Sequence, residues 1–369
     1  MKLLIFGGKG GVGKSSISAA TAVKLSNLEP KSNVLLISFD IAHNLSDLFA
    51  KQIGNELTQI TSNLWAIEPD PDLYAEKVTQ RFGTLMRELL SSTPIVKRMP
   101  KLEDYIQETF TTKSMSLSLK NALFFQRIID ADDIIEDMKE ADSAIANFDV
   151  LQKMKFDYII ADFPPTGNMI SLFEVPKNTV QVVLKSTLHM FAEMKDFFKK
   201  IKTAAKILNP FSKGVTEEQK NRSKEILEII KNVEKRAERV TTLMKESGSL
   251  RLVTIPEKPS FEELKRGREL SKPYIALDAV HINRIIPTKY HRCEMCRQIR
   301  VIQDKYIEAI ESEFSDVKIW KSHMLKKEPI GLRRLKKLAD EIFGSKINGT
   351  QILSPQSLFG VGNLQNKPE

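Results

Sequence analysis

The sequence has little cysteine and no long apolar run. Its 369 residues include only two cysteines, Cys293 and Cys296, which excludes a disulfide framework and directs attention to metal or redox chemistry. No window approaches the roughly twenty uninterrupted apolar residues of a spanning helix, and the first residues lack the charged and apolar parts of a secretory leader. We therefore expect a cytoplasmic protein.

The charge balance is basic, because 56 Lys and Arg residues outnumber 47 Asp and Glu residues and leave a formal net charge of +9. A positive excess suits acidic partners such as nucleotide phosphates, anionic lipid or nucleic acid. Solvated lysine-rich helices give the same total, so charge alone selects no partner. The hydrophobic content of 41% is that of a globular protein with a sizeable core.

Short β-rich runs recur along the chain, with helical patterns between them. They cover residues 2–6, 33–40, 64–68, 156–162, 179–186, 251–256, 279–287 and 317–320. Nearly continuous hydrophobicity within a run is typical of parallel strands that are buried on both faces. The pattern predicts an α/β fold with a doubly wound, mostly parallel sheet.

Two long segments, approximately residues 72–150 and 187–248, do not follow that alternation. In the second, apolar residues keep the three-to-four spacing of a helix with one packed face. We expect helical insertions that form a second lobe within a main domain of residues 1–343. Residues 344–369 are polar and rich in Gly, Asn, Ser and Pro, which predicts a disordered tail.

The chemistry begins at FGGKGGVGKSSIS, residues 6–18, between a predicted strand and a predicted helix. Gly8, Gly13, Lys14 and Ser15 satisfy the phosphate-loop pattern G-x-x-x-x-G-K-[ST]. In such a loop, backbone N–H groups and the helix dipole face the phosphates, the lysine neutralises them and the hydroxyl can bind Mg²⁺. The alternative is an unoccupied glycine turn. We predict a nucleotide site formed by Gly8, Lys9, Gly10, Gly11, Val12, Gly13, Lys14, Ser15 and Ser16.

Two aspartates follow predicted strands, at the end where open α/β sheets bind ligands. Asp40 can orient or deprotonate an attacking water, and Asp162 can hold Mg²⁺ directly or through a water. Either side chain could instead cap a helix. Beside a phosphate loop, we interpret them as site residues and place Ser15, Asp40 and Asp162 around magnesium.

At these motifs the chain resembles the ArsA-like ATPases, in particular those that deliver tail-anchored membrane proteins in eukaryotes and archaea. The form GKGGVGK, with the extra lysine Lys9, resembles their deviant Walker A loop. DIAHNLSD (40–47) resembles their first switch, D-P-A-H-N/S-L-S-D, and DFPPTG (162–167) resembles their second switch, D-T-A-P-T-G. The resemblance runs from residue 2 to about 343 and is weakest over the two insertions.

The resemblance implies a role for each matching residue. Lys9 would reach across a dimer interface to the partner's nucleotide, and Lys14 and Asp40 would be the other catalytic residues. Asn44 would sense the nucleotide, and Asn283, in HINRIIP, would read adenine. The second switch would include Pro165, Thr166 and Gly167.

The sequence departs from the family at two places. It has PTGNMIS (165–171) where the family usually continues P-T-G-H-T-L-R, and His323 stands near the position of the proline in the adenine-contacting loop. The phosphate contacts are intact, so we expect ATP binding to survive. The departures bear on the coupling of hydrolysis to client binding.

Cys293 and Cys296 form a C-x-x-C pair between a predicted strand and a predicted helix. Two thiolates at this spacing suit one edge of a tetrahedral zinc site, but redox pairs and Fe–S carriers share it. The resemblance implies that a partner protomer supplies two more cysteines, which gives a zinc ion shared across a homodimer. Within one chain, His291 or His323 could complete the shell instead.

The second insertion carries Met190, Phe191, Met194 and Phe198 at helical spacing. A flexible apolar surface of this kind accepts varied hydrophobic helices. The same pattern is equally consistent with a packed core.

Our leading hypothesis is a homodimeric ATPase with ATP, Mg²⁺ and Zn²⁺, which binds transmembrane segments of tail-anchored proteins and delivers them to a membrane. A membrane receptor would be a further partner, and we expect no nucleic acid. The alternatives are the ATPase subunit of an arsenite or anion pump and an Fe–S carrier NTPase. A pump needs further soft ligands and usually fuses two halves, whereas this chain has one phosphate loop. The Fe–S carriers lack AHNLSD.

Overall fold

The computed structural model describes residues 1–40, 44–70, 156–170, 241–290 and 293–354, with the single residues 173, 217, 221, 238 and 239. The chain divides into two compact units. The first comprises Met1–Pro69, Ala131–Ile170 and Thr242–Glu369, and it holds nearly all of the described residues. The strand predicted at 179–186 and most of both predicted insertions lie outside the described residues.

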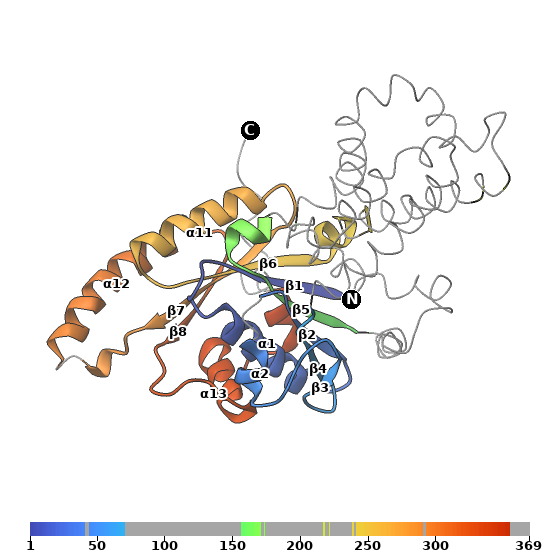
Figure 1. Cartoon of the computed structure of the whole chain (residues 1–369). Coiled ribbons are helices and arrows are strands. Elements are labelled where there is room, and N and C mark those ends of the chain that lie inside the picture. Colours follow the sequence, from blue (N-terminus) through green and yellow to red (C-terminus); the bar gives the residue numbers. More distant parts are fainter. Residues whose placement is uncertain are drawn as a thin grey trace, which may run out of the picture. The chain divides into compact units, whose positions relative to one another are not determined.

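The first unit is built on one twisted sheet (Figure 1). Within the described residues the sheet has eight strands in the order β3-β4-β2-β5-β1-β6-β7-β8. All neighbouring pairs are parallel except β3 with β4. The strands are β1 (Lys2–Gly7), β2 (Val34–Ser38), β3 (Thr58–Gln59), β4 (Leu64–Ile67), β5 (Tyr158–Asp162), β6 (Gly248–Thr254), β7 (Leu277–Ile285) and β8 (Lys318–His323). The prediction of a doubly wound, mostly parallel α/β sheet is confirmed.

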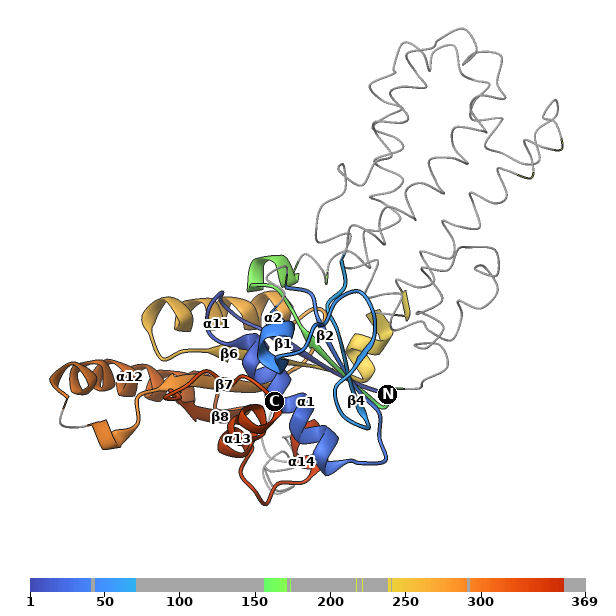
Figure 2. The same cartoon turned by 60° about the horizontal axis from the view of Figure 1, so that its bottom comes forward.

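Helices cover both faces of this sheet (Figures 1 and 2). They are α1 (Lys14–Leu28), α2 (Asn44–Phe49), α11 (Lys258–Ser271), α12 (Glu294–Glu313), α13 (Leu332–Phe343) and α14 (Gly349–Leu353), with a 3-10 turn at Thr288–Tyr290. α1, α13 and α14 contribute to one hydrophobic core on one face, and α11 and α12 lie on the other. No helix in the described ranges is long and apolar enough to cross a membrane.

The central strand β1 positions the site. Phe6, near its carboxyl end, is level with Asp162 of β5 on one side and with Arg251 of β6 on the other. β1 is apolar and almost fully buried, as a parallel strand covered on both faces must be. The residues that follow β1 and β5 therefore meet at one edge of the sheet.

The prediction of a disordered tail is wrong over residues 344–354. Helix α14 forms there, and Asn348 and Gln351 close a capping box: Gln351 N donates to Asn348 Oδ1 at 2.9 Å and Asn348 N donates to Gln351 Oε1 at 3.1 Å. Ile352 is fully buried, and its carbonyl accepts from the Arg251 guanidinium. One buried apolar residue is too little to show periodicity, so the sequence pattern missed this contact. Residues 355–369 lie outside the described residues.

A buried polar cluster lies beneath this end of the chain. Arg251 is fully buried and pairs with Asp278, with Nε 3.3 Å from Oδ1. His281, on β7, lies between the rings of Phe6 and Phe343, with centroid distances of 5.6 and 6.0 Å. Burial first, and then the Arg251 charge, hold the pKa of His281 well below 6.5. His281 is therefore a neutral residue of the core at neutral pH.

Candidate functional site

The phosphate loop connects β1 to α1 and is pressed against the ends of two further strands. Gly8 has φ 139° and Gly13 has φ 95°, backbone conformations that residues other than glycine rarely adopt. A Cβ at Gly8 would lie 2.2 Å from the Val253 carbonyl oxygen, and a Cβ at Gly13 would lie 2.4 Å from Asn283 Nδ2. Both glycines are thus required by backbone conformation and by close packing.

The N-terminus of α1 is open to an anion. Gly13 is its N-cap residue and offers no side-chain hydrogen bond to the first turn. Lys14 is 4% exposed, and its Nζ donates to the Lys9 carbonyl at 3.4 Å. The first N–H groups of a helix, together with its dipole, bind phosphate well. The loop predicted from sequence therefore has the geometry of a phosphate site.

Asp162 is fully buried at the end of β5, beside this loop. Ser38 Oγ donates to its Oδ2 at 3.4 Å, and its Oδ1 has no hydrogen-bond partner among the described residues. Burial raises the pKa of Asp162 to about 7, as does the nearby charge of Asp40, whereas Ser15 and Lys14 oppose the rise. A cation would relieve this buried charge.

The oxygen atoms around Asp162 fit Mg²⁺. Hydroxyl and carboxylate oxygens are hard ligands, and Mg²⁺ usually takes one or two carboxylates together with phosphates and water. Ser15, Asp40 and Asp162 supply this kind of donor set. Among the residues that the structure describes, no group of three or more His, Cys, Asp and Glu side chains could hold a metal by itself.

The segment predicted to be the first switch, residues 40–47, is only partly described. Asp40 follows β2, and its backbone N–H donates to Ser38 Oγ at 3.3 Å. Residues 41–43 lie outside the described residues, and Asn44 begins α2.

Glu68, which we did not predict, anchors the start of α2. It is 2% exposed; Leu45 N donates to its Oε1 at 2.7 Å and Ser46 Oγ to its Oε2 at 3.0 Å. The sequence signal that could have indicated Glu68 is its place directly after the apolar run 64–67.

The segment predicted to be the second switch follows β5 and continues into a helical segment at residues 166–170. Pro165 is exposed, and its Cγ would lie 3.8 Å from a Cβ at Gly10 of the phosphate loop. Thr166 is 1% exposed, and its hydroxyl has no partner in the described part of the chain. Gly167 is exposed. Met169, one of the departures from the family pattern, packs against Gly7.

Asn283 contacts the phosphate loop directly. Its Nδ2 donates to the Val12 carbonyl at 2.9 Å. Its Oδ1 accepts from Ser322 Oγ at 2.8 Å and from Arg284 N at 2.9 Å. Both lone pairs of Oδ1 are therefore used, and one N–H of the amide is left for another acceptor. The adenine-reading role of Asn283 stays a prediction.

Lys9 is paired within its own chain. Its Nζ lies 3.3 Å from Oε1 of Glu257, and both side chains are about two-fifths exposed, at 41% and 42%. Glu257 is the N-cap residue of α11 and also accepts from Ser260 Oγ at 3.0 Å. Sequence reasoning missed Glu257, because 248 residues separate it from Lys9.

The cysteine pair lies at the start of α12. Cys293 is the N-cap residue, and its Sγ accepts from Cys296 N at 3.3 Å. Both thiols are free. The Cys296 thiol, followed by the Cys296 and Met295 N–H groups, lowers the pKa of Cys293. The pair can supply two thiolate ligands of a soft metal.

Of the two histidines predicted as alternative metal ligands, only His323 lies among the described residues. The His323 backbone N donates to Glu341 Oε1 at 2.7 Å, and its Nδ1 lies 3.2 Å from the same oxygen; its role as a metal ligand stays a prediction. His291 lies outside the described residues, as do the four residues of the predicted client surface, Met190, Phe191, Met194 and Phe198.

A doubly wound parallel sheet whose first strand leads through a glycine loop into a helix N-terminus defines a phosphate-loop NTPase. The family model described as anion-transporting ATPase matches residues 1–344. The chain belongs to this family and is an ATPase.

The relatives carry names of two kinds. "Putative arsenical pump-driving ATPase 1" of Aquifex aeolicus is 29% identical over 94% of this chain and 80% of its own length. "ATPase GET3" of Clavispora lusitaniae is 26% identical over 92% and 88%. "ATPase ASNA1 homolog" of Dictyostelium discoideum is 27% identical over 96% and 93%. Identity at this level does not separate the two kinds.

Proposed function

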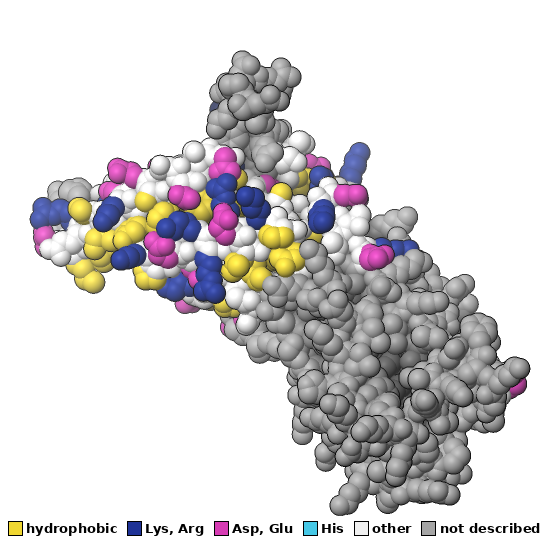
Figure 3. Space-filling view, turned by 90° about the horizontal axis from the view of Figure 1, so that it is seen from above, with side chains coloured by type: hydrophobic (Ala, Val, Ile, Leu, Met, Phe, Trp, Pro, Cys, Tyr) yellow, Lys and Arg dark blue, Asp and Glu magenta, His cyan; other side chains and the backbone are white. Residues whose placement is uncertain are grey.

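We propose that this ATPase is a homodimeric targeting factor that binds hydrophobic transmembrane segments of tail-anchored proteins in the cytoplasm and delivers them to a membrane. The observation that carries the proposal is the exposed face of α12. Met295, Val301 and Ile302 are 70%, 67% and 55% exposed next to two free thiols. Figure 3 shows hydrophobic side chains on the surface of this part of the first unit. A second copy of the chain would cover them.

ATP would be held by the phosphate loop, with its outer phosphates at Lys14 and the start of α1. Ser15, Asp162 and Asp40 would hold Mg²⁺, which compensates phosphate charge when it is bound. Asp40 would orient the attacking water and accept its proton. Phosphoryl transfer depends mainly on such positioning and charge compensation.

Dimer closure would bring Lys9 to the partner's nucleotide. In the single chain this lysine pairs with Glu257. A partly exposed ion pair of this kind contributes little, typically below about 1 kcal/mol. A triphosphate in the partner would compete with it easily, so the lysine is available for a role in trans.

The two thiols of each protomer would form a shared Cys₄ zinc site. Cys293 is prepared for this role by its lowered pKa and its place at a helix N-terminus. Metal analysis of anaerobically purified protein distinguishes zinc from an Fe–S cluster. A metal-replete, stable dimer of Cys293→Ser would contradict the shared site.

The experiment that tests the function is co-purification with a tail-anchored substrate, with and without ATP. We expect capture to depend on ATP and to be lost when Met190, Phe191 and Met194 are made polar. The matched control makes Met324 and Leu270 polar, two exposed apolar residues elsewhere on the chain at 48% and 39%. Equal capture by both variants would contradict the client surface.

A second candidate is the ATPase subunit of an arsenical pump, because several relatives carry that name. It would use the same nucleotide site. Arsenite needs soft thiolate ligands, and the only two cysteines of the chain lie together at the start of α12. Hydrolysis that is stimulated by arsenite, without ATP-dependent capture of an apolar segment, would favour the pump.

A further inference from the structure

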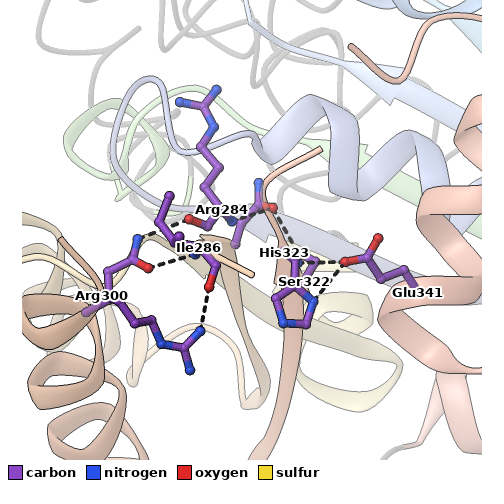
Figure 4. Close-up of polar contacts among 8 residues, drawn as sticks. Arg284, Ile286, Arg300, Ser322, His323 and Glu341 are labelled. Carbon is purple, nitrogen blue, oxygen red and sulfur yellow. Dashed lines mark hydrogen bonds and ion pairs between the residues drawn. The ribbon is translucent and has the colours of Figure 1, made fainter. Parts of the chain in front are cut away.

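The end of β7 is held by side chains of α12 in place of a neighbouring strand. Gln303 Nε2 donates to the Arg284 carbonyl at 3.1 Å, and Ile286 N donates to Gln303 Oε1 at 2.8 Å. The pairing of β7 with β8 is irregular between Ile282 and Ile285. One amide side chain therefore satisfies a carbonyl and an N–H that the sheet leaves open (Figure 4).

Arg300 holds the same stretch from one turn earlier on α12. Its Nη1 donates to the Ile286 carbonyl at 2.6 Å, and its Nε lies 2.6 Å from Asp304 Oδ1. Gln303 is 9% exposed and is the one polar residue among the three buried residues of this helix. A buried amide that makes both kinds of hydrogen bond is costly to replace.

These bonds hold the backbone of a strained residue. Arg284 has φ 58°, a left-handed backbone conformation that is unfavourable for most residues other than glycine. Such a conformation persists only where the surrounding structure imposes it, and it often occurs at functional sites. Here the imposed contacts are Gln303 on the carbonyl and Asn283 on the N–H of Arg284.

The strained turn continues into the phosphate loop through Asn283. The amide whose Oδ1 accepts from Arg284 N also donates to the Val12 carbonyl and packs against Gly13. Four residues from three elements, α12, β7 and the phosphate loop, thus form one chain of contacts, which runs Gln303, Arg284, Asn283, Val12.

We propose that Gln303 is a positioning residue for the nucleotide. It fixes the left-handed turn at Arg284 and, through Asn283, holds the phosphate loop in the shape that accepts ATP. The inference rests on the ATPase activity and not on the targeting role, because it concerns ATP affinity in the single protomer. It also connects the helix that carries the cysteine pair to the nucleotide.

The first test is Gln303→Met, which keeps side-chain length and removes both hydrogen bonds. We expect the Kd and KM for MgATP to rise about tenfold, since two buried bonds are lost, while kcat at saturating ATP changes less than threefold. The control is Lys305→Met, which introduces methionine at an exposed position of the same helix. It should change neither the affinity for MgATP nor kcat. A fall in kcat with an unchanged KM would overturn the proposal.

The second test, Gln303→Glu, separates positioning from loss of fold. An ionised carboxyl still accepts from Ile286 N but opposes the Arg284 carbonyl oxygen, whereas a protonated one donates to it. Burial raises the pKa of the introduced group, and the nearby charge of Arg300 lowers it. Other charged or titratable groups around this turn belong to Arg284, His323 and Glu341 (Figure 4), and to Asp304, which pairs with Arg300.

We expect the MgATP Kd of Gln303→Glu, measured by calorimetry, to fall toward the wild-type value between pH 8 and pH 6. The wild type and Gln303→Met provide the baseline, and the ratio of variant to wild type is the quantity compared. Recovery of MgATP affinity at low pH in Gln303→Glu, and not in Gln303→Met, supports the hydrogen bond from the side chain at position 303 to the Arg284 carbonyl. A ratio that does not change with pH, in a protein with a normal unfolding transition, would overturn it.

Discussion

The phosphate loop and the end of β7 meet at Asn283, and the two regions are built from different kinds of residue. On one side, glycines, Lys14 and the buried carboxyl group of Asp162 concentrate charge and backbone freedom. On the other, the neutral amides of Asn283 and Gln303 satisfy backbone groups. The first region presents charge and buries a carboxyl group whose pKa is raised to about 7. The second supplies shape, through hydrogen bonds that form without a ligand.

The sharpest way to break this comparison is Asp162→Asn. We expect turnover to fall at least about 100-fold, since a carboxylate beside Mg²⁺ and phosphate is lost. The apo protein should become more stable at pH 8, with Tm about 5 °C higher in EDTA, because a buried charge is removed.

The contribution of Asp162 to stability depends on pH, and its raised pKa determines the sign of this dependence. The pKa of Asp162 is about 7 in the fold against 3.8 for a free group, so the folded state binds the extra proton between these values. Stability from this residue therefore falls as pH rises from about 4 to 7. Thermal unfolding at pH 5 and pH 8 should show a smaller difference in Asp162→Asn than in the wild type. An equal difference would refute the assignment.

The next test compares two glycines of the loop. Gly13→Ala combines a positive φ with a Cβ 2.4 Å from Asn283, whereas Gly11→Ala has a positive φ of 80° and no atom within 4 Å of its Cβ. We expect MgATP affinity to fall more than about tenfold in Gly13→Ala and roughly threefold in Gly11→Ala, where only backbone strain acts. Binding is measured by calorimetry. Equal losses would mean that contact with Asn283 is irrelevant.

A smaller effect is expected at the ion pair between Lys9 and Glu257. Glu257→Gln frees the lysine, so ATP-dependent dimerisation should strengthen about two- to threefold, in keeping with a partly exposed pair. Glu262→Gln, which removes the partner of Lys265 on the same helix, is the matched control. Light scattering with MgATP measures the dimer. Weaker dimerisation in Glu257→Gln would contradict the role of Lys9 in trans.

The smallest effect on activity is expected at the core. His281 has a lowered pKa in the fold, so the unfolded chain binds a proton below about pH 6.5 that the folded chain refuses. This residue therefore costs stability increasingly as pH falls, by up to about 2 kcal/mol at pH 5. His281→Phe should reduce that loss and leave ATP turnover at pH 8 unchanged. His323→Phe, at a 50% exposed ring, should not reduce it.

Much of the fold and part of the site could be predicted from local pattern. Each of the described strands other than the short β3 corresponds to an apolar run, and the phosphate loop was found from four residues within eight positions. Continuous hydrophobicity is a direct consequence of burial on both faces. The loop is equally local, because its backbone must turn and approach phosphate within a few residues.

The residues that were missed act through distant partners. Glu257 pairs with Lys9 across 248 positions, and Gln303 reaches Arg284 across 19. Glu68 anchors α2 across 23 positions. A single glutamine on a solvated helix carries no pattern, because hydrogen bonding to a bulged strand end does not repeat along the sequence.

The sequence by itself determined the class of this protein, because strand burial, the glycine turn and the charge beside it are written within short segments. Only the tertiary structure decided how the site is supported: which carboxyl group is buried to the point of a raised pKa, which glutamate holds Lys9, and which amide fixes the left-handed turn at Arg284. Burial and hydrogen bonding at these places depend on segments that meet only when the sheet has formed.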